Sequence, residues 1–424
     1  MSTLKVNKLR DTAGSADAIT LDPNGGAVLA GVTTVTSVKV GAAVTISESG
    51  IEASGIGITC ANINGAQIGG RRNLIINGAM NIAQRGTSST TNGFGSVDRF
   101  QGQHSGTDEN PTQAQVDVAS GTTPYTLGFR KALKITNGNQ TGGAGATDLI
   151  NIQYKVEAQD IANSGWNYTS TSSYITLSFW IKSSVAQSFK GHLRTKDGTE
   201  QRYAFETGSL TADTWTKIIK TIPGNSNLTF DNDNGEGVQI NIAAFWGTDY
   251  TDNSVTENVW AAHSSGARMK DNTSTWYTTN DATLEFTGVQ LEVGSQATAF
   301  EHCSFGDELR RCQRYYFRFT ASTAGTYIAM GHQMTSSAAK IVLPFPNSMR
   351  TRPTAVETTG TATDYSVART STYEVCDVVP TFAGASKEVA NVNTNQTQAS
   401  LATTLPVALR ANSTSFYLGF SAEL

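Results

Sequence analysis

The chain has 424 residues, enough for two or three domains, and only 16% of them are charged. Its 31 basic and 35 acidic residues give a formal net charge of −4 without a long basic run, which excludes nucleic acid as an expected partner. The 40 Gly against 9 Pro are typical of short strands joined by tight turns, and 17 Phe, 13 Tyr and 6 Trp supply apolar area for a core. We therefore expect an all-β protein.

The cysteines and the start of the chain bear on where the protein is made. Cys60, Cys303, Cys312 and Cys376 form no CxxC pair, so we expect reduced thiols in a protein assembled in a cytoplasm. The opening MSTLKVNKLRD lacks the apolar core of a secretory signal, and no stretch approaches the length of a membrane span. We expect a soluble protein with no membrane insertion.

Residues 1–70 contain no aromatic side chain, and Gly recurs every few positions. Isolated Ile residues stand between Gly, Ser and Asn at positions 46, 51, 56, 58, 63 and 68. A flexible linker is one interpretation of this composition. Because the β-branched residues are frequent and regularly spaced, we favour a slender β shaft in which several chains share the Ile side chains. The residues expected near the shaft axis are Ile51, Ile56 and Ile58.

Residues 71–302 show the strict alternation of half-buried strands. In YITLSFWIK, Ile175, Leu177, Phe179 and Ile181 share one face. Asp197-Gly198 between two strand-like runs predicts a hairpin. The run LEFTGVQLEV alternates in opposite phase on either side of Gly288, which predicts a β-bulge there. These patterns favour an antiparallel β-sandwich of jelly-roll type.

Residues 303–424 open with the one helix that the pattern predicts, in GDELRRCQRYY, with Leu309, Cys312 and Tyr316 on one face. Alternation returns at YFRF, KIVLPF and SFYLGF. We expect a smaller C-terminal β domain, or tip, whose last strand is buried.

An ordered set of motifs resembles a recurrent module of bacteriophage tail fibres. The motifs are RRNLIINGAMNIAQRGTS (71–88), SVDRF (96–100), YITLSFWIKSS (174–184), TGVQLEVGSQATAFEH (287–302) and DELRRCQRYYFRF (307–319). STLKVNKL and GIEASGIGIT also resemble attachment and shaft segments of fibres from phages of marine bacteria and cyanobacteria. The resemblance implies a homotrimeric virion fibre with a jelly-roll similar to carbohydrate-binding modules. Phe100 stands where such fibres commonly have Trp, and the last hundred residues match only loosely.

The implied partners follow from that resemblance. They are two further copies of the chain, a baseplate or tail protein bound through the N-terminus, and a host surface glycan or outer-membrane receptor. The implied location is the virion tail.

Few residues suggest catalysis or a cofactor. The five His show no HxH or HExxH spacing, and no GxSxG or P-loop is present, so we expect no enzyme activity and no cofactor. Asp231 and Asp233 in DNDNGEG have some character of a calcium loop, but other EF-hand ligands are lacking. A solvated Asn-Gly turn is the alternative.

Exposed aromatic rings beside amide side chains would suit a sugar, whose flat C–H face stacks on a ring while its hydroxyls form hydrogen bonds. Trp180 falls on the polar face of its strand. Phe245 shares a face with Gln239 and Asn241, and Trp276 and Tyr277 lie in a polar run that is typical of a loop. The alternative is that these rings pack under loops or between subunits, because Trp is highly buried on average.

Three functions fit these observations. The first is a tail fibre that recognises the host surface through glycans. The second is a head fibre or capsid decoration protein with a purely structural role. The third is a glycan-degrading tailspike, which would need two converging carboxylates.

Overall fold

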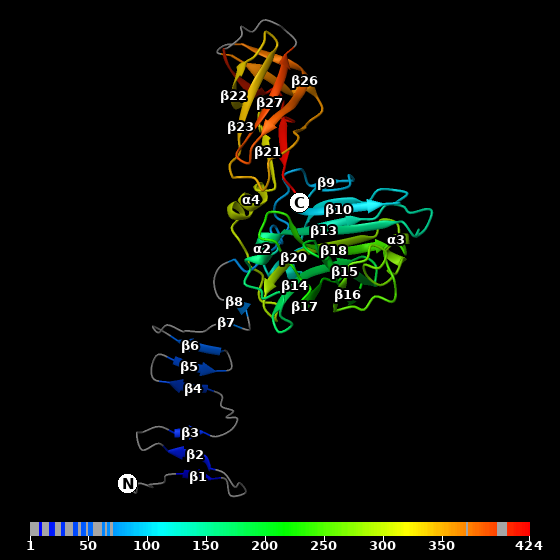
Figure 1. Cartoon of the computed structure of the whole chain (residues 1–424), viewed down its shortest axis with the longest axis vertical. Coiled ribbons are helices and arrows are strands. Elements are labelled where there is room, and N and C mark those ends of the chain that lie inside the picture. Colours follow the sequence, from blue (N-terminus) through cyan, green and yellow to red (C-terminus); the bar gives the residue numbers. More distant parts are fainter. Residues whose placement is uncertain are drawn as a thin grey trace. The chain divides into compact units, whose positions relative to one another are not determined.

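The computed structural model describes residues 71–369, 372–396 and 405–424, and before residue 71 only the backbone of eight short strands. The protein is all-β, as predicted, with several antiparallel sheets and a few short helices (Figure 1). The chain forms two compact units, residues 1–61 and 62–424. The expected domain boundaries at residues 70 and 302 stay predictions.

The first unit contains two three-stranded antiparallel sheets. One consists of β1 (Lys8–Arg10), β2 (Asp17–Leu21) and β3 (Ala27–Leu29), and the other of β4 (Ser37–Val40), β5 (Val44–Ser47) and β6 (Gly50–Ala53). In the second sheet, Ile46 pairs with Ile51. The side chain of Ile51 and the whole of Ile56, Ile58 and Cys60 lie outside the described residues, so the shaft axis stays a prediction. A short pair, β7 (Asn62–Ile63) and β8 (Ala66–Gln67), begins the second unit.

Two six-stranded antiparallel sheets form the middle of the second unit. The first has the order β10 (Phe100–Ser105), β13 (Leu149–Glu157), β18 (Glu236–Trp246), β15 (Ser188–Thr195), β16 (Gln201–Ser209) and β19 (Trp260–Ala262). The second has the order β17 (Thr216–Pro223), β14 (Tyr174–Ser183), β20 (Thr283–Val293), β12 (Lys131–Thr136), β11 (Thr112–Asp117) and β9 (Ser88–Ser89). The hairpin predicted at Asp197-Gly198 is confirmed, because it joins β15 to β16 and Gly198 has a φ of 61°.

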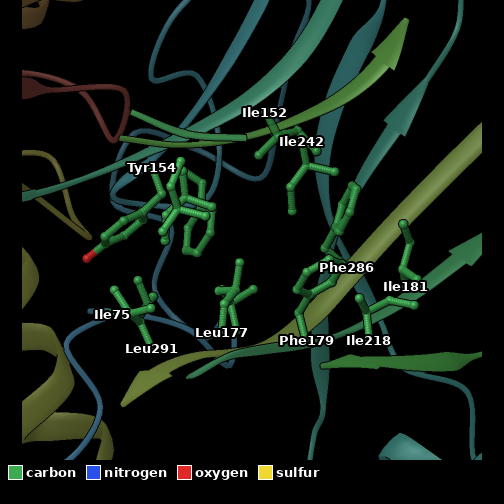
Figure 2. Packing of buried hydrophobic residues seen from close by; sticks show 14 of the residues in the cluster. Ile75, Ile152, Tyr154, Leu177, Phe179, Ile181, Ile218, Ile242, Phe286 and Leu291 are labelled. Atoms are coloured by element: carbon green, nitrogen blue, oxygen red, sulfur yellow. The ribbon is translucent and has the colours of Figure 1, made fainter. Parts of the chain in front are cut away.

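The core lies between these two sheets. Figure 2 shows Ile152 and Tyr154 of β13 and Ile242 of β18 facing Leu177 and Phe179 of β14. The alternation seen in the sequence places these residues inward, because successive side chains of a strand point to opposite faces. Burying each of them contributes about 1.5–3 kcal/mol.

Two bulges change the face that a strand turns to the core. The predicted bulge at Gly288 is confirmed: Ser178 pairs with Gln290 but Trp180 pairs with Thr287, and Gly288 has a φ of 62°. The second bulge, in β18, was not predicted. Ile150 pairs with Phe245 whereas Asn151 pairs with Ala243, so the strand changes phase at Ala244.

The short helices α1 (Thr123–Thr126), α2 (Ala158–Ala162) and α3 (Thr275–Thr278) interrupt the sandwich, although the sequence predicted none there. Helix α4 (Phe305–Gln313) is the predicted one, capped by Ser304, whose Oγ accepts from the Asp307 amide. It ends before Tyr316, which lies in strand β21 rather than on the helix. Within the described ranges, no helix is both long enough and apolar enough to cross a membrane.

The chain ends in a closed six-stranded barrel and a small three-stranded sheet. The barrel strands are β22 (Tyr327–Gln333), β23 (Ala338–Pro344), β27 (Val389–Gln396), β26 (Tyr373–Ala385), β25 (Tyr365–Ala368) and β28 (Pro406–Ala411). The small sheet consists of β21 (Tyr316–Thr320), β29 (Tyr417–Ser421) and β24 (Glu357–Thr358), and a 3₁₀ turn spans Ala362–Asp364. The buried last strand is confirmed, because Leu418 and Phe420 have no exposed surface.

Candidate functional site

One face of the first sheet turns polar side chains away from the core. Asn241 in β18 has Gln153 of β13 opposite it on one side and His192 of β15 on the other. In the next row, Gln239 lies between Lys155 and Arg194, and Arg194 lies opposite Arg202 of β16. The predicted pair Gln239 and Asn241 therefore lies at the centre of a polar surface that crosses four strands.

Amide hydrogen bonds order this surface. Asn151 Nδ2 donates to Gln103 Oε1 and to Asn241 Oδ1, each at 3.0 Å. Gln153 Nε2 also donates to Asn241 Oδ1 at 3.0 Å, and Asn241 Nδ2 lies 3.3 Å from His192 Nε2. These bonds fix the side-chain orientations before any ligand arrives.

Aromatic groups lie at one end of the surface. The rings of His192 and Trp246 have centroids 5.4 Å apart, and those of His192 and His263 are 6.5 Å apart and stacked. Arg268 lies over Trp246, 4.9 Å from the ring centroid. Val255 and Met269 pack with Trp246 in a small apolar cluster that closes this end.

Unpartnered buried polar atoms gather on this face. Of the twelve buried side-chain nitrogen and oxygen atoms without a hydrogen-bond partner among the described residues, six lie here. They are Asn151 Oδ1, His192 Nδ1, Arg202 Nε, Arg202 Nη1, Trp246 Nε1 and His263 Nδ1. Such atoms are few in folded proteins and cost free energy unless water or a ligand satisfies them. We call Asn151, Gln153, His192, Arg202, Gln239, Asn241, Trp246 and His263 the sheet-face cluster.

The cluster holds its histidines neutral. Burial, with the nearby His263 and the cations Arg268, Arg194 and Arg202, lowers the pKa of His192 well below its usual range. Burial and Arg194 likewise lower the pKa of His263 to about 4. At neutral pH each imidazole therefore offers one donor and one acceptor.

Three of the predicted aromatic residues are not exposed. Phe245 was expected beside Gln239 and Asn241, but the bulge at Ala244 turns it into the core. Trp276 and Tyr277 belong to helix α3 rather than to a loop, and 0% and 1% of their surfaces are exposed. The Phe245 and Tyr277 rings stack on each other at 4.4 Å. The expectation that these rings present an open face is wrong.

Trp180 lies apart from the cluster. It belongs to β14 in the second sheet and packs, half-buried, beside the cluster formed by Val118, Phe129 and Ala132. Trp180 and Phe245 therefore do not line one groove. A binding role for Trp180, Gln239 or Asn241 stays a prediction.

The weak calcium candidates are exposed. Asp233 Oδ1 accepts from the Gly235 amide at 2.8 Å, and the Asp231 amide donates to Asp197 Oδ2 at 3.0 Å. In the ranges that the structure describes, no group of three or more His, Cys, Asp or Glu could hold a metal ion. The calcium expectation also stays a prediction.

Sequence reasoning missed His192, Arg202, Trp246 and His263 as members of the site. In the sequence, Asn151 and Gln153 alternate with Ile150 and Ile152, which indicates a polar face for β13 but not which strands lie beside it. Strand order is a long-range property, and it brings these residues together.

A cavity of about 500 Å³ lies elsewhere, lined partly by Arg71, Arg72, Arg311 and Arg314. Arg314 pairs with Glu157 at 2.8 Å and Arg311 with Glu308 at 3.7 Å, so two of the four charges are already compensated. The sheet-face cluster is therefore the stronger candidate.

No protein-family model matches the sequence, and no curated protein matches it either. Among solved structures, the enzymatically active domain of tailspike protein 4 of bacteriophage CBA120 is 9% identical with a TM-score of 0.28, over 52% of this chain and 21% of that one. A family 11 carbohydrate-binding module from Clostridium thermocellum, in complex with a β-1,3-1,4-mixed-linked tetrasaccharide, is 12% identical with a TM-score of 0.23, over 51% and 98%. A family 30 carbohydrate-binding module is 11% identical with a TM-score of 0.24, over 53% and 87%. The chain thus spans about a fifth of the tailspike domain, and these similarities assign no family.

Proposed function

We propose that the chain is a structural attachment fibre of a bacteriophage tail that binds a glycan of the host surface through the sheet-face cluster. The observation that carries the proposal is the concentration of unpartnered buried polar atoms on one sheet face, beside Trp246. Sugar hydroxyls both donate and accept, so they suit a surface that carries an unpartnered acceptor, Asn151 Oδ1, and an unpartnered donor, Trp246 Nε1. The ordered amides around them reduce the entropy that binding costs.

The virion setting rests on the sequence motifs between residues 71 and 319 that resemble tail fibres. In this proposal the N-terminal segment attaches to a baseplate or tail protein. The chain binds its glycan without cleaving it.

The test is binding of the full chain to an array of bacterial surface polysaccharides, followed by titration of the strongest ligand. Trp246→Phe keeps the ring but removes the Nε1 donor, so we expect affinity to fall about tenfold, the value of one hydrogen bond. Trp166→Phe is the matched control, because Trp166 Nε1 is also buried and unpartnered but lies in the sandwich core. Equal affinities for the Trp246→Phe chain and the parent would contradict this site.

We also propose that the fibre is a parallel homotrimer joined through residues 1–70, with Ile51, Ile56 and Ile58 near the axis. A lone shaft would forfeit about 1.5–3 kcal/mol for each isolated Ile left in water, and three chains can turn these side chains inward. Sedimentation of the full chain should give three times the chain mass. Ile56→Asp should lower that mass while the sandwich keeps its melting transition, and a monomeric parent chain would refute the assembly.

A further inference from the structure

Arg202 is the charged member of the sheet-face cluster. Only 8% of its surface is exposed, and its Nε and Nη1 atoms are buried without a hydrogen-bond partner. No carboxylate of the described residues lies within 4 Å of it, although most other buried or half-buried cations of the sandwich have one. Burying a charge without a partner costs several kcal/mol, so an unpartnered Arg202 destabilises the fold unless an anion from outside the chain pairs with it.

The neighbouring strand supplies no anion. Arg194 lies directly opposite Arg202 in the β15–β16 ladder, where a carboxylate would have stabilised the charge of Arg202. Arg194 is compensated, because its Nε donates to Glu200 Oε2 at 2.8 Å. Glu200 is also bonded to Lys196, so it is shared by two cations and leaves Arg202 without an anion.

Two more charged side chains, Arg268 and Asp252, lie near members of the cluster. Arg268 donates to the Ser265 carbonyl and stacks over Trp246 and Tyr250, but pairs with no carboxylate of the described chain within 4 Å. Asp252 is the acidic residue whose charge acts on Arg202, yet it is exposed and its Oδ1 accepts from the Ser254 amide at 2.7 Å. Arg202 in the cluster and Arg268 beside Trp246 are therefore two cations without a carboxylate partner among the described residues, next to neutral histidines.

We propose that the glycan bound by the sheet-face cluster is acidic, and that Arg202 binds its anionic group. The inference rests on the proposed glycan-binding function and names the ligand class. A guanidinium presents five donors and is weakly hydrated, so it suits a uronate carboxylate, a sulfate ester or a phosphate ester. An anion at this place supplies the acceptors that Nε and Nη1 lack.

The binding test compares charged and neutral forms of one backbone. The probes are polygalacturonate against its fully methyl-esterified form, hyaluronate against its methyl ester, and dextran sulfate against dextran. We expect at least one acidic probe to bind about 30-fold or more tightly than its neutral form, the loss typical when one partner of a buried charge pair is removed. Comparing the carboxylate probes with the sulfate probe identifies the anionic group. If the preference for the acidic form weakens from 50 to 500 mM salt, the preference is electrostatic.

The outcomes separate this inference from the proposed function. Binding to neutral probes with no preference for any acidic form overturns the acidic ligand but keeps glycan binding. Binding to no probe and to no polysaccharide of the array overturns both.

Three variants test whether Arg202 causes the preference for acidic over neutral probes. Arg202→Met should abolish that preference and also raise Tm, because an uncompensated buried charge is removed. Arg194→Met should lower Tm, since it leaves Glu200 without its main partner. Asp252→Asn should change neither the preference for acidic probes nor Tm. A lower Tm in Arg202→Met and in Asp252→Asn would show a structural Arg202–Asp252 pair instead, and would overturn the proposal.

Discussion

Replacing Glu423 with Gln should lower the free energy of unfolding by about 3–5 kcal/mol, the usual cost of removing one partner from a buried ion pair. Arg99 is 1% exposed at its side chain and is bonded to Glu423, which is 5% exposed. Burial alone would lower the pKa of Arg99, but the Glu423 carboxylate raises it above the usual value, so the guanidinium stays charged. In the variant that charge loses its anion.

The surroundings show why this pair matters. Arg99 donates to the Lys155 carbonyl at 2.7 Å and lies over the Tyr315 ring, 3.5 Å from its centroid. Arg350 donates to the carbonyls of Ala422 and Glu423, each at 2.7 Å. The last residues of the chain, which fray in most proteins, are therefore bound to the sandwich through Arg99 and to the segment between β23 and β24 through Arg350.

Chemical denaturation of the full chain would measure the loss. Asp117→Asn is the matched control, because the Lys131–Asp117 pair has its carboxylate side chain 81% exposed and should contribute less than about 1 kcal/mol. If Glu423→Gln were no more harmful than Asp117→Asn, the pair would not hold the chain end in place.

The strands could be predicted from the sequence where one face stays in the core along the whole strand. Leu177 and Phe179 alternate with polar residues over the whole of β14, and each faces the core as expected. Gly288 could also be predicted, because the phase of the alternation changes at a residue that tolerates a positive φ.

The site was harder to predict, and β18 shows why. Its bulge occurs at Ala243-Ala244, where two small residues carry no polarity signal, so the alternation seemed to continue and Phe245 was placed on the wrong face. Trp276 and Tyr277 failed for another reason. Polar neighbours predicted a loop, but Trp276 Nε1 donates to the Thr283 carbonyl and Tyr277 Oη donates to the distant Asp148, and these partners allow both rings to be buried.

Acidification should destabilise the sheet-face cluster. The folded chain holds His192 and His263 with pKa values below the ordinary 6.5, so between those values the unfolded chain binds protons that the folded chain does not. Stability is therefore complete above about pH 6.5 and falls as the pH decreases. For His263 the loss ends near pH 4, where the folded form also takes up its proton. Between pH 7.5 and 5, each imidazole that stays neutral in the folded chain lowers the free energy of unfolding by up to about 2 kcal/mol.

Histidine variants separate the contribution of His192 and His263 to the pH dependence of stability from that of other groups. Burial raises the pKa of Asp98 to about 6, which acts in the opposite direction, since the folded chain then binds the proton more tightly. Asp98 is present in every variant, so its effect cancels when stabilities are compared. His192→Gln and His263→Gln should each reduce the difference in unfolding free energy between pH 7.5 and pH 5, and the double variant should reduce it most.

His332→Gln serves as the control, because His332 is exposed on the barrel strand β22, away from the cluster. It should leave the pH dependence unchanged. The double variant decides between two charge states of the imidazoles. If it lost more unfolding free energy between pH 7.5 and pH 5 than the parent does, the imidazoles would be charged in the folded chain. Arg194, Arg202 and Arg268 would then be compensated by anions of the chain itself, and the site would have no need of an acidic ligand.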